Sequence, residues 1–294
     1  MRPASETPTG LLRRWLESQL EAAAQAWLSE TLQRLAEGAM GRDLFLAFSL
    51  VPRKIGKDDL GLQAADLAAA EAARTGWRPA AWSVDQAARI LILLSAGGNE
   101  GEFARRLEQL CQTADVRELI ALYRGLPLYP GPELHLDRAR EGLRSNMVAV
   151  FEAVAHENPY AVEQFPTEVW NQMVLKAIFV GSTLHPIQGL DGRRNADLAR
   201  TLVDYAHERW AAGRTITPEL WRLVAPFMDG AIVADLETPL AAAQGPERQA
   251  LALALREAGG APAGALLAAH PDLESDIEAG RISWETVSRD MAKP

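Results

Sequence analysis

Polar side chains that could bind or process a small molecule gather on one face of a helix expected over residues 136–156. There are five of them, at offsets of three, seven, fourteen and eighteen positions from the first: Arg138, Glu141, Ser145, Glu152 and His156. At about 100° of turn per residue, all five lie within about 60° of one another. They form either a polar seam that faces a cleft between helix layers or a solvated face with helical ion pairs, each worth about 0.2–0.5 kcal/mol.

The next expected helix, over residues 168–180, carries Asn171, Gln172 and Lys176 among apolar residues. Lys176 is one of only four lysines in the chain and stands in an apolar stretch. A desolvated lysine at this position could bind an anion or form a Schiff base. Alternatively, its amine reaches solvent while its stem covers apolar surface.

A glycine-containing loop over residues 181–194 precedes a helix expected to begin at Asn195. Gln188 and Asp191 lie in this loop, with two glycines and two arginines nearby. Backbone N–H groups and the dipole at a helix N-terminus attract anions, which predicts an anion site. The loop lacks the sequence of a phosphate-binding P-loop, and a tight surface loop held by arginine–aspartate pairs explains the same residues.

The helix expected over residues 195–212 places Asp204, His207 and Glu208 on one face, followed by Arg209. Carboxylate and imidazole groups at this spacing could ligate a divalent metal. However, no second histidine follows at the four-residue spacing of a zinc-protease helix. Hydrogen bonds between helices are therefore the expected role, and no metal site and no cofactor are expected.

A compact basic loop is expected at residues 53–57, where Arg53, Lys54 and Lys57 bring three cations together. Such a cluster could bind a phosphate or pyrophosphate group. A solubilising surface loop would have the same composition. The cluster contrasts with the chain as a whole, whose formal net charge is -9.

Nearly every segment of the chain predicts helix, because apolar residues recur at spacings of three and four and alanine is abundant. Ser83 with Gln86 and Asn99 with Glu102 have the form of capping boxes at helix N-termini. Alternating β-strand patterns are scarce. We therefore expect an all-α fold of stacked short antiparallel helices, as in an irregular, HEAT-like α-solenoid.

Three regions differ in composition, although we expect one continuous domain. Residues 1–125 form an N-terminal helical region rich in alanine and leucine, and residues 231–294 form a region of short helices. Between them, residues 126–230 are rich in polar motifs and carry the expected site. A stretch of glycines and prolines at residues 125–132 marks the first transition.

Composition excludes several classes of protein. The 294 residues carry too few spare cations for a general nucleic-acid binder, because phosphate neutralisation needs a basic face. The single cysteine, Cys111, excludes a disulfide framework and a cysteine-based metal site. No apolar run approaches the length of a transmembrane helix, and no secretory signal is recognised at the N-terminus. We therefore expect a cytoplasmic protein.

Several motifs in a fixed order resemble the EboA family over about residues 122–228. They are Arg144-Ser145-Asn146-Met147, Phe151-Glu152-Ala153-Val154-Ala155, Glu157-Asn158-Pro159-Tyr160, Trp170-Asn171-Gln172-Met173-Val174-Leu175-Lys176-Ala177, Gln188-Gly189-Leu190-Asp191 and Tyr205-Ala206-His207-Glu208-Arg209-Trp210-Ala211-Ala212-Gly213-Arg214. The resemblance implies a bacterial gene cluster for secondary metabolites and their traffic. Neighbouring proteins in such clusters resemble a membrane prenyltransferase, a sugar-phosphate cyclase, a metal hydrolase and a sugar-isomerase-like barrel. The resemblance assigns no catalytic residue.

The sequence thus predicts a helical protein that binds or processes a small anionic or prenylated metabolite intermediate. The alternatives are a non-catalytic scaffold for the pathway's enzymes, including the membrane prenyltransferase, and an enzyme acting on a phosphorylated cyclitol or prenyl intermediate. Whether there is turnover stays open. The residues expected to line a binding cleft are Arg144, Asn146, Glu152, Asn158, Asn171, Gln172, Lys176, Gln188, Asp191, Asp204, His207 and Arg209, with Arg53, Lys54 and Lys57 as an anion-binding loop.

Overall fold

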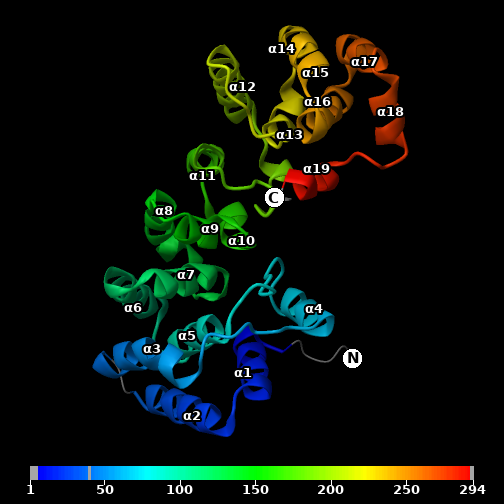
Figure 1. Ribbon diagram of the computed structural model, residues 1–294. Helices are drawn as coiled ribbons and strands as arrows, with labels where there is room; N and C mark the ends of the chain where they lie inside the picture. The colour runs from blue at the N-terminus through cyan, green and yellow to red at the C-terminus, as the bar shows by residue number, and fades with distance from the viewer. Residues whose placement is uncertain (1–5, 39–40, 292–294) are drawn as a thin grey trace, which may run out of the picture. The chain divides into compact units, whose positions relative to one another are not determined.

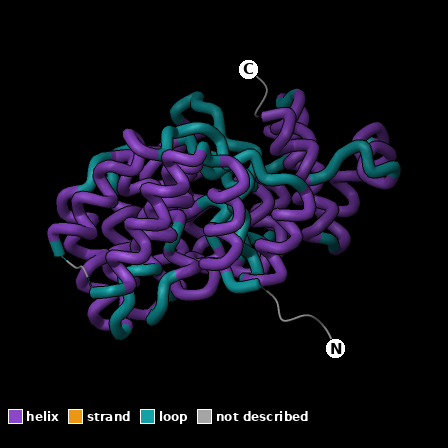
Figure 2. Tube along the Cα trace, turned by 90° about the horizontal axis from the view of Figure 1, so that it is seen from below, coloured by secondary structure: helices purple, strands orange, loops and turns teal. Residues whose placement is uncertain are grey.

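The computed structural model describes residues 6–38 and 41–291. Over these residues the chain forms α-helices joined by loops and short 3₁₀ turns, with no strand beyond an isolated bridge between Asp59 and Ser83 (Figure 2). The prediction of an all-α fold is confirmed. In this described part of the chain, no helix combines the length and apolar character needed to cross a membrane.

The chain divides into two compact units, with the boundary between Val169 and Trp170. This boundary falls near the start of α11 (Thr167–Val180), within the polar region of residues 126–230. The three regions of composition, the single continuous domain and the HEAT-like solenoid stay predictions.

The first unit contains α1 to α10 and two 3₁₀ turns (Figure 1). Their bounds are α1 (Pro8–Gln19), α2 (Ala22–Ala36), α3 (Arg42–Lys54), α4 (Ala64–Ala73), α5 (Val84–Leu94), α6 (Glu100–Thr113), α7 (Val116–Arg124), η1 (Leu126–Leu128), η2 (Pro132–His135), α8 (Leu136–Arg144), α9 (Val148–Ala155) and α10 (Pro159–Gln164). Helix α5 is central, because α1, α2, α3 and α7 all pack against it. Every residue from Ala87 to Leu93 is buried, as in a helix surrounded by others.

Helices α5, α7 and α9 pack in sequence order, and α8 packs on α9 (Figure 1). The two capping boxes predicted at Ser83 and Asn99 are confirmed, and further ones occur at Gln63 and Asp115, the N-caps of α4 and α7. In each, a side chain at the N-cap and another three residues later satisfy two backbone N–H groups that the helix cannot. These caps fix where α5, α6 and α7 begin.

The single helix predicted over residues 136–156 is wrong, because the chain leaves the helix after Arg144 and starts again at Val148. Ser145 has extended backbone angles, and its hydroxyl accepts a hydrogen bond from the Met147 backbone N–H at 3.1 Å. Such a local bond competes with the helical hydrogen-bond pattern. The five polar residues of this segment are therefore divided between α8 and α9 and do not form one continuous seam.

The second unit contains the remaining elements. They are the greater part of α11, η3 (Asp191–Arg193), α12 (Ala196–Ala211), α13 (Leu220–Val224), η4 (Ala225–Phe227), α14 (Gly230–Asp235), α15 (Glu237–Ala242), α16 (Gly245–Ala258), α17 (Gly260–Ala268), α18 (Pro271–Glu278) and α19 (Trp284–Met291). Helix α16 packs against α13, α15, α17, α18 and α19. Its residues from Ala250 to Leu255 are all buried, so α16 forms the centre of this unit.

A buried carboxylate links distant segments of the second unit. Glu219 is 1% exposed, and its two oxygens accept hydrogen bonds from the backbone N–H groups of Leu184 and His185 at 2.7 and 2.9 Å. The hydroxyl of Ser288 on α19 donates a third bond at 2.9 Å. These three hydrogen bonds compensate the buried charge of Glu219. Because their donors come from the loop before α12 and from the last helix, the carboxylate holds these two segments together.

Candidate functional site

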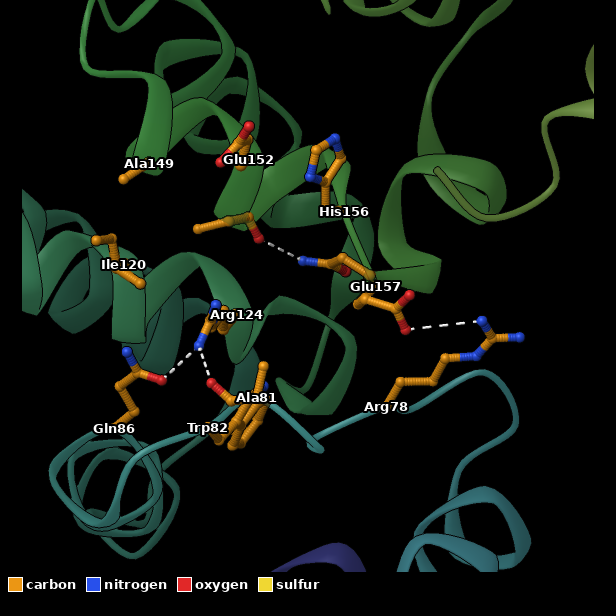
Figure 3. Close-up of a pocket in the computed structure, with 12 residues that line it drawn as sticks. Arg78, Ala81, Trp82, Gln86, Ile120, Arg124, Ala149, Glu152, His156 and Glu157 are labelled. Atoms are coloured by element: carbon orange, nitrogen blue, oxygen red, sulfur yellow. Dashed lines mark hydrogen bonds and ion pairs between the residues drawn. The ribbon is translucent and has the colours of Figure 1, made fainter. Parts of the chain in front are cut away.

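A polar pocket lies in the first unit, between α5, α7 and α9 and the turn that leads into α10 (Figure 3). Its volume is about 220 Å³. The segment before α5 contributes Arg78 and Trp82, α7 contributes Arg124, and α9 contributes Glu152. Because all of these elements belong to the first unit, the pocket is complete within it.

Arg124, the last residue of α7, is held along one edge of the pocket. Its Nη1 donates hydrogen bonds to the backbone oxygen of Ala81 at 2.8 Å and to Oε1 of Gln86 at 2.7 Å (Figure 3). Burial lowers the pKa of Arg124, and the carboxylate of Glu152 acts in the opposite direction. An arginine keeps its charge at neutral pH even so.

The same guanidinium has hydrogen-bonding capacity to spare. Among the described residues, none accepts a hydrogen bond from Nε or Nη2 of Arg124. A guanidinium carries five N–H donors in a planar fork, and its edges match carboxylate, phosphate or paired hydroxyl groups. Arg124 is therefore a fixed donor that a ligand can approach.

Glu152 and His156 supply a carboxylate and an imidazole from α9 and its C-cap. They stand four residues apart, and both line the pocket and are half-buried. The backbone N–H of His156 bonds to the backbone oxygen of Glu152 at 2.8 Å, so the helical turn continues to His156. Residues four apart share a helix face, which explains why both side chains reach the same pocket.

Glu157 forms part of the rim and has unusual backbone geometry. Its φ of +50° is the only positive value at a non-glycine residue in the described part of the chain. Left-handed geometry at such a residue costs about 1–2 kcal/mol, and strained backbone of this kind is enriched at functional sites. The Glu157 carboxylate lies 3.6 Å from Arg78, and both side chains are about half exposed. The ion pair is therefore weak and can open.

Asn158 sits in the wall of the pocket, but its amide serves the fold. Nδ2 donates to the backbone oxygens of Tyr123 and Ala153, both at 3.0 Å, and Oδ1 accepts from the Tyr160 backbone N–H at 3.0 Å. The residue is 2% exposed and caps α10. Asn158 thus ties α7, α9 and α10 together and shapes the turn that carries Glu157.

The charges of the pocket balance. Two arginines, Arg78 and Arg124, face two carboxylates, Glu152 and Glu157, so the formal charge is zero with His156 neutral. Apolar wall is added by Trp82, Ile120 and Ala149, among others. A site with donors, acceptors and an apolar wall suits a compact ligand with several hydroxyl groups, since each hydroxyl both donates and accepts.

Of the twelve residues expected to line one cleft, only Glu152 and Asn158 line this pocket. Arg144 is exposed, pairs with Glu141 and lines a separate pocket of the same unit beside Cys111. Asn146 is exposed in the turn between α8 and α9.

The next predicted residues lie in the second unit. Asn171 exchanges side-chain hydrogen bonds with Asn195, the N-cap of α12, at 2.8 and 3.2 Å. Gln172 is exposed, whereas Gln188 and Lys176 are half-buried. Burial lowers the pKa of Lys176.

The arginines of the loop before α12 are engaged by the protein itself. Asp191 accepts two hydrogen bonds of 2.7 Å from Arg222, and Arg194 pairs with Glu257 at 2.5 Å. Burial raises the pKa of Asp191, but the hydrogen bonds and charge of Arg222 and the charge of Arg194 outweigh it, so the pKa is lowered. Arg193 stacks over Trp170 at 4.8 Å. This geometry favours the tight-loop interpretation over an anion site.

On α12, Asp204 is exposed and His207 pairs with Asp235 at 3.1 Å. Arg209 donates two hydrogen bonds to the backbone oxygen of Thr215. Within the described ranges, no three histidine, cysteine or acidic side chains are grouped closely enough to hold a metal ion.

The basic loop expected at residues 53–57 is corrected in part. Arg53 and Lys54 are the last residues of α3, and the chain turns only from Ile55 onwards. Both side chains and that of Lys57 are exposed. Cations in the last turn of a helix complement the helix dipole, so the fold alone explains the positions of Arg53 and Lys54.

Sequence reasoning missed the half of the pocket that precedes residue 126. Arg78, Trp82, Gln86 and Arg124 lie in the alanine- and leucine-rich region, outside residues 126–230, where the main site was expected. The sequence does indicate that both polar residues stand at helix ends, because Gln86 belongs to a capping box and Arg124 ends a helix beside Gly125. It does not indicate that the two side chains contact each other.

The fold and this pocket define an all-α protein with a small polar site. The chain belongs to the family described as metabolite traffic protein EboA, whose model matches residues 8–225. The match covers the described first unit from α1 onwards and continues through α13. No curated protein and no solved structure matches the chain. Family membership supports a role in metabolite traffic in general terms.

Proposed function

We propose that this chain serves metabolite traffic by binding a small polar metabolite in the pocket of the first unit. The observation that carries the proposal is Arg124, which is fixed from one edge by Ala81 and Gln86 while no described residue accepts a hydrogen bond from Nε or Nη2. A preorganised donor in a concave site is what small-molecule pockets use to orient a ligand.

The size and lining of the pocket favour a compact, hydroxylated ligand. About 220 Å³ corresponds to roughly seven water molecules at about 30 Å³ each. That space suits a single polyol ring better than an extended prenylated molecule. The formal charge of zero allows a neutral polyol or a monoester of phosphate, whose anionic group would pair with Arg124.

A blocking substitution tests whether this pocket is the binding site. Ala149 lines the pocket and is exposed on α9, so Ala149→Phe fills the space without removing a hydrogen bond. Val148 is the next residue, is 41% exposed and does not line the pocket, so Val148→Phe is the matched control. We expect the first substitution to abolish ligand retention and the second to leave it unchanged.

The measurement is mass spectrometry of small molecules retained by the purified full chain after exposure to a metabolite extract of the producing cells. Titrations with myo-inositol and its monophosphate then compare a neutral with an anionic polyol. The proposal fails if no retained molecule is lost in Ala149→Phe. A time-dependent change in the mass of a retained molecule would indicate an enzyme rather than a carrier.

The expected cytoplasmic location and the pathway partners belong to the same proposal. A carrier would hand its ligand to another protein of the pathway, and the membrane prenyltransferase is the partner that the family resemblance implies. Purification of the tagged chain with its pathway proteins, with and without Ala149→Phe, tests whether association depends on the ligand.

A further inference from the structure

A second pocket lies in the second unit, between the end of α12 and the helices α14, α15 and the start of α16. Its volume is about 460 Å³. Trp210 of α12 forms one wall, and Pro239 and Ala242 of α15 form another. Most of its lining lies beyond residue 225, where the family match ends. This pocket is therefore a feature separate from the one in the first unit.

The aromatic wall of this pocket is held in place by neighbouring rings. Trp210 is half-buried and stacks on the buried Trp221, with ring centroids 5.5 Å apart and an angle of 21° between the planes. The imidazole of His207 lies 5.9 Å from the Trp210 ring. Because these contacts fix the ring, the indole offers a preorganised surface, and an indole face attracts cations through its quadrupole.

Two carboxylates complete the pocket. Asp235, at the end of α14, uses one oxygen to pair with His207 at 3.1 Å. Glu247, in the first turn of α16, forms no hydrogen bond or ion pair with any described residue, and burial raises its pKa. No lysine or arginine is among the lining residues, so Asp235 and Glu247 give the pocket a formal charge of -2 with histidine neutral.

The charged form of a partly buried carboxylate is costly unless a cation or hydrogen-bond donor compensates it. The N-terminal dipole of α16 stabilises Glu247 to some extent. The dipole explains why a carboxylate stands at position 247, but it explains neither the cavity nor the aromatic wall beside it. A bound cation would explain all three features.

We infer that this pocket binds a small organic cation, with its charged group near Trp210, Asp235 and Glu247 and its apolar part against Pro239 and Ala242. Charge complementarity and the aromatic wall define the ligand class as an ammonium group on a compact apolar body. The site is independent of the polar pocket proposed above.

Choline is the probe cation, and 3,3-dimethylbutan-1-ol, which has carbon in place of nitrogen, is its uncharged isostere. Indole N–H resonances of the full ¹⁵N-labelled chain are followed by NMR during titration with each compound. Trp210→Phe assigns the Trp210 resonance among those of the eight tryptophans by its disappearance. We expect choline to shift this resonance and to bind about tenfold more tightly than the isostere, which corresponds to about 1.4 kcal/mol.

Glu247→Gln keeps the size of the side chain and removes its charge, and we expect it to weaken choline binding about fivefold. Glu237→Gln is the matched control, because Glu237 is an exposed carboxylate on α15 that does not line the pocket. Equal binding of choline and its isostere would overturn the inference, as would an unchanged Trp210 resonance. Unchanged affinity in Glu247→Gln would also overturn it and leave Glu247 as a stabiliser of the α16 N-terminus.

Discussion

Nη1 of Arg124 lies 2.7 Å from Oε1 of Gln86, so the end of α7 is joined to the first turn of α5 at the edge of the polar pocket. The same nitrogen reaches the backbone oxygen of Ala81 at 2.8 Å. One guanidinium thus connects three segments of the first unit. Since the contact is also part of the pocket wall, it links the stability of the unit to its capacity to bind a ligand.

Arg124→Gln should lower both the stability of the first unit and its capacity to bind a ligand. Hydrogen bonds to a charged group contribute about 1.5–3 kcal/mol, so we expect the free energy of unfolding, measured with urea, to fall by about 2 kcal/mol. Arg105→Gln is the control, because Arg105 is an exposed arginine on α6 and its loss should change stability by less than about 0.5 kcal/mol. Equal effects of the two substitutions would show that the Arg124 contacts contribute nothing specific.

Asn158→Ala should be more disruptive than the same change at another asparagine. It removes the N-cap of α10, worth about 1 kcal/mol, and leaves the backbone oxygens of Tyr123 and Ala153 without their bonds. We expect a loss of about 3 kcal/mol in the free energy of unfolding. Asn146→Ala, in an exposed turn of the same unit, should cost less than about 0.5 kcal/mol. A loss below about 1 kcal/mol at position 158 would contradict the structural role of its amide.

Glu157→Gly should stabilise the first unit, because glycine adopts a φ of +50° without steric cost. Removing the strain should raise the free energy of unfolding by about 1 kcal/mol. The greater flexibility of glycine in the unfolded chain reduces this gain. Glu157→Gln keeps the strained backbone but removes the ion pair with Arg78, so the difference between the two variants isolates the backbone effect. If thermal unfolding shows Glu157→Gly to be less stable than Glu157→Gln, the geometry at this residue is not strained.

The sequence predicts the helices of this protein better than it predicts how they meet. Capping boxes at Ser83 and Asn99 depend on residues three apart, so they can be read directly from the chain. The break after Arg144 was missed because no proline marks it, and a serine hydroxyl bonded to a nearby N–H accompanies the end of the helix instead. Such local competition is decided by tertiary packing, which periodicity does not report.

The pocket shows the same limit. Glu152 and Asn158 were identified because polar residues are dense in their own segment. Arg124 and Trp82 lie in a region dominated by apolar residues, and they reach the pocket only because α5, α7 and α9 pack together. Contacts between segments more than thirty positions apart leave no pattern in a single sequence, so this half of the pocket could be found only from the fold.

The pH dependence of the second unit should reflect Asp191. Its pKa is lowered in the folded state, although burial acts against this, because Arg222 donates two hydrogen bonds to the carboxylate. A carboxylate whose pKa is lowered by folding stabilises the protein at pH values above its pKa in the unfolded chain, which is about 3.9 for aspartate. This stabilisation is lost as the pH falls through the pKa of the folded state. The stability difference between wild type and Asp191→Asn should therefore be present at neutral pH and shrink below about pH 4. Urea unfolding at a series of pH values checks this, and a difference that is constant with pH would contradict it.

Glu219 should be the most sensitive polar residue of the second unit. Glu219→Ala leaves the N–H groups of Leu184 and His185 without their acceptor, whereas the hydroxyl of Ser288 still has the Trp284 backbone oxygen within reach. Each unsatisfied buried group costs about 1–3 kcal/mol, so we expect a loss of at least about 2 kcal/mol in the free energy of unfolding.

Ser288→Ala separates the contribution of the last helix from that of the loop before α12. It removes one donor to Glu219 and keeps both backbone bonds, so the expected loss in urea unfolding is about 1 kcal/mol. Combining it with Glu219→Ala should add little, because the hydroxyl then has no carboxylate to reach and residues in one network are not additive. Full additivity of the two losses would mean that Ser288 stabilises α19 through its bond to the Trp284 backbone oxygen alone.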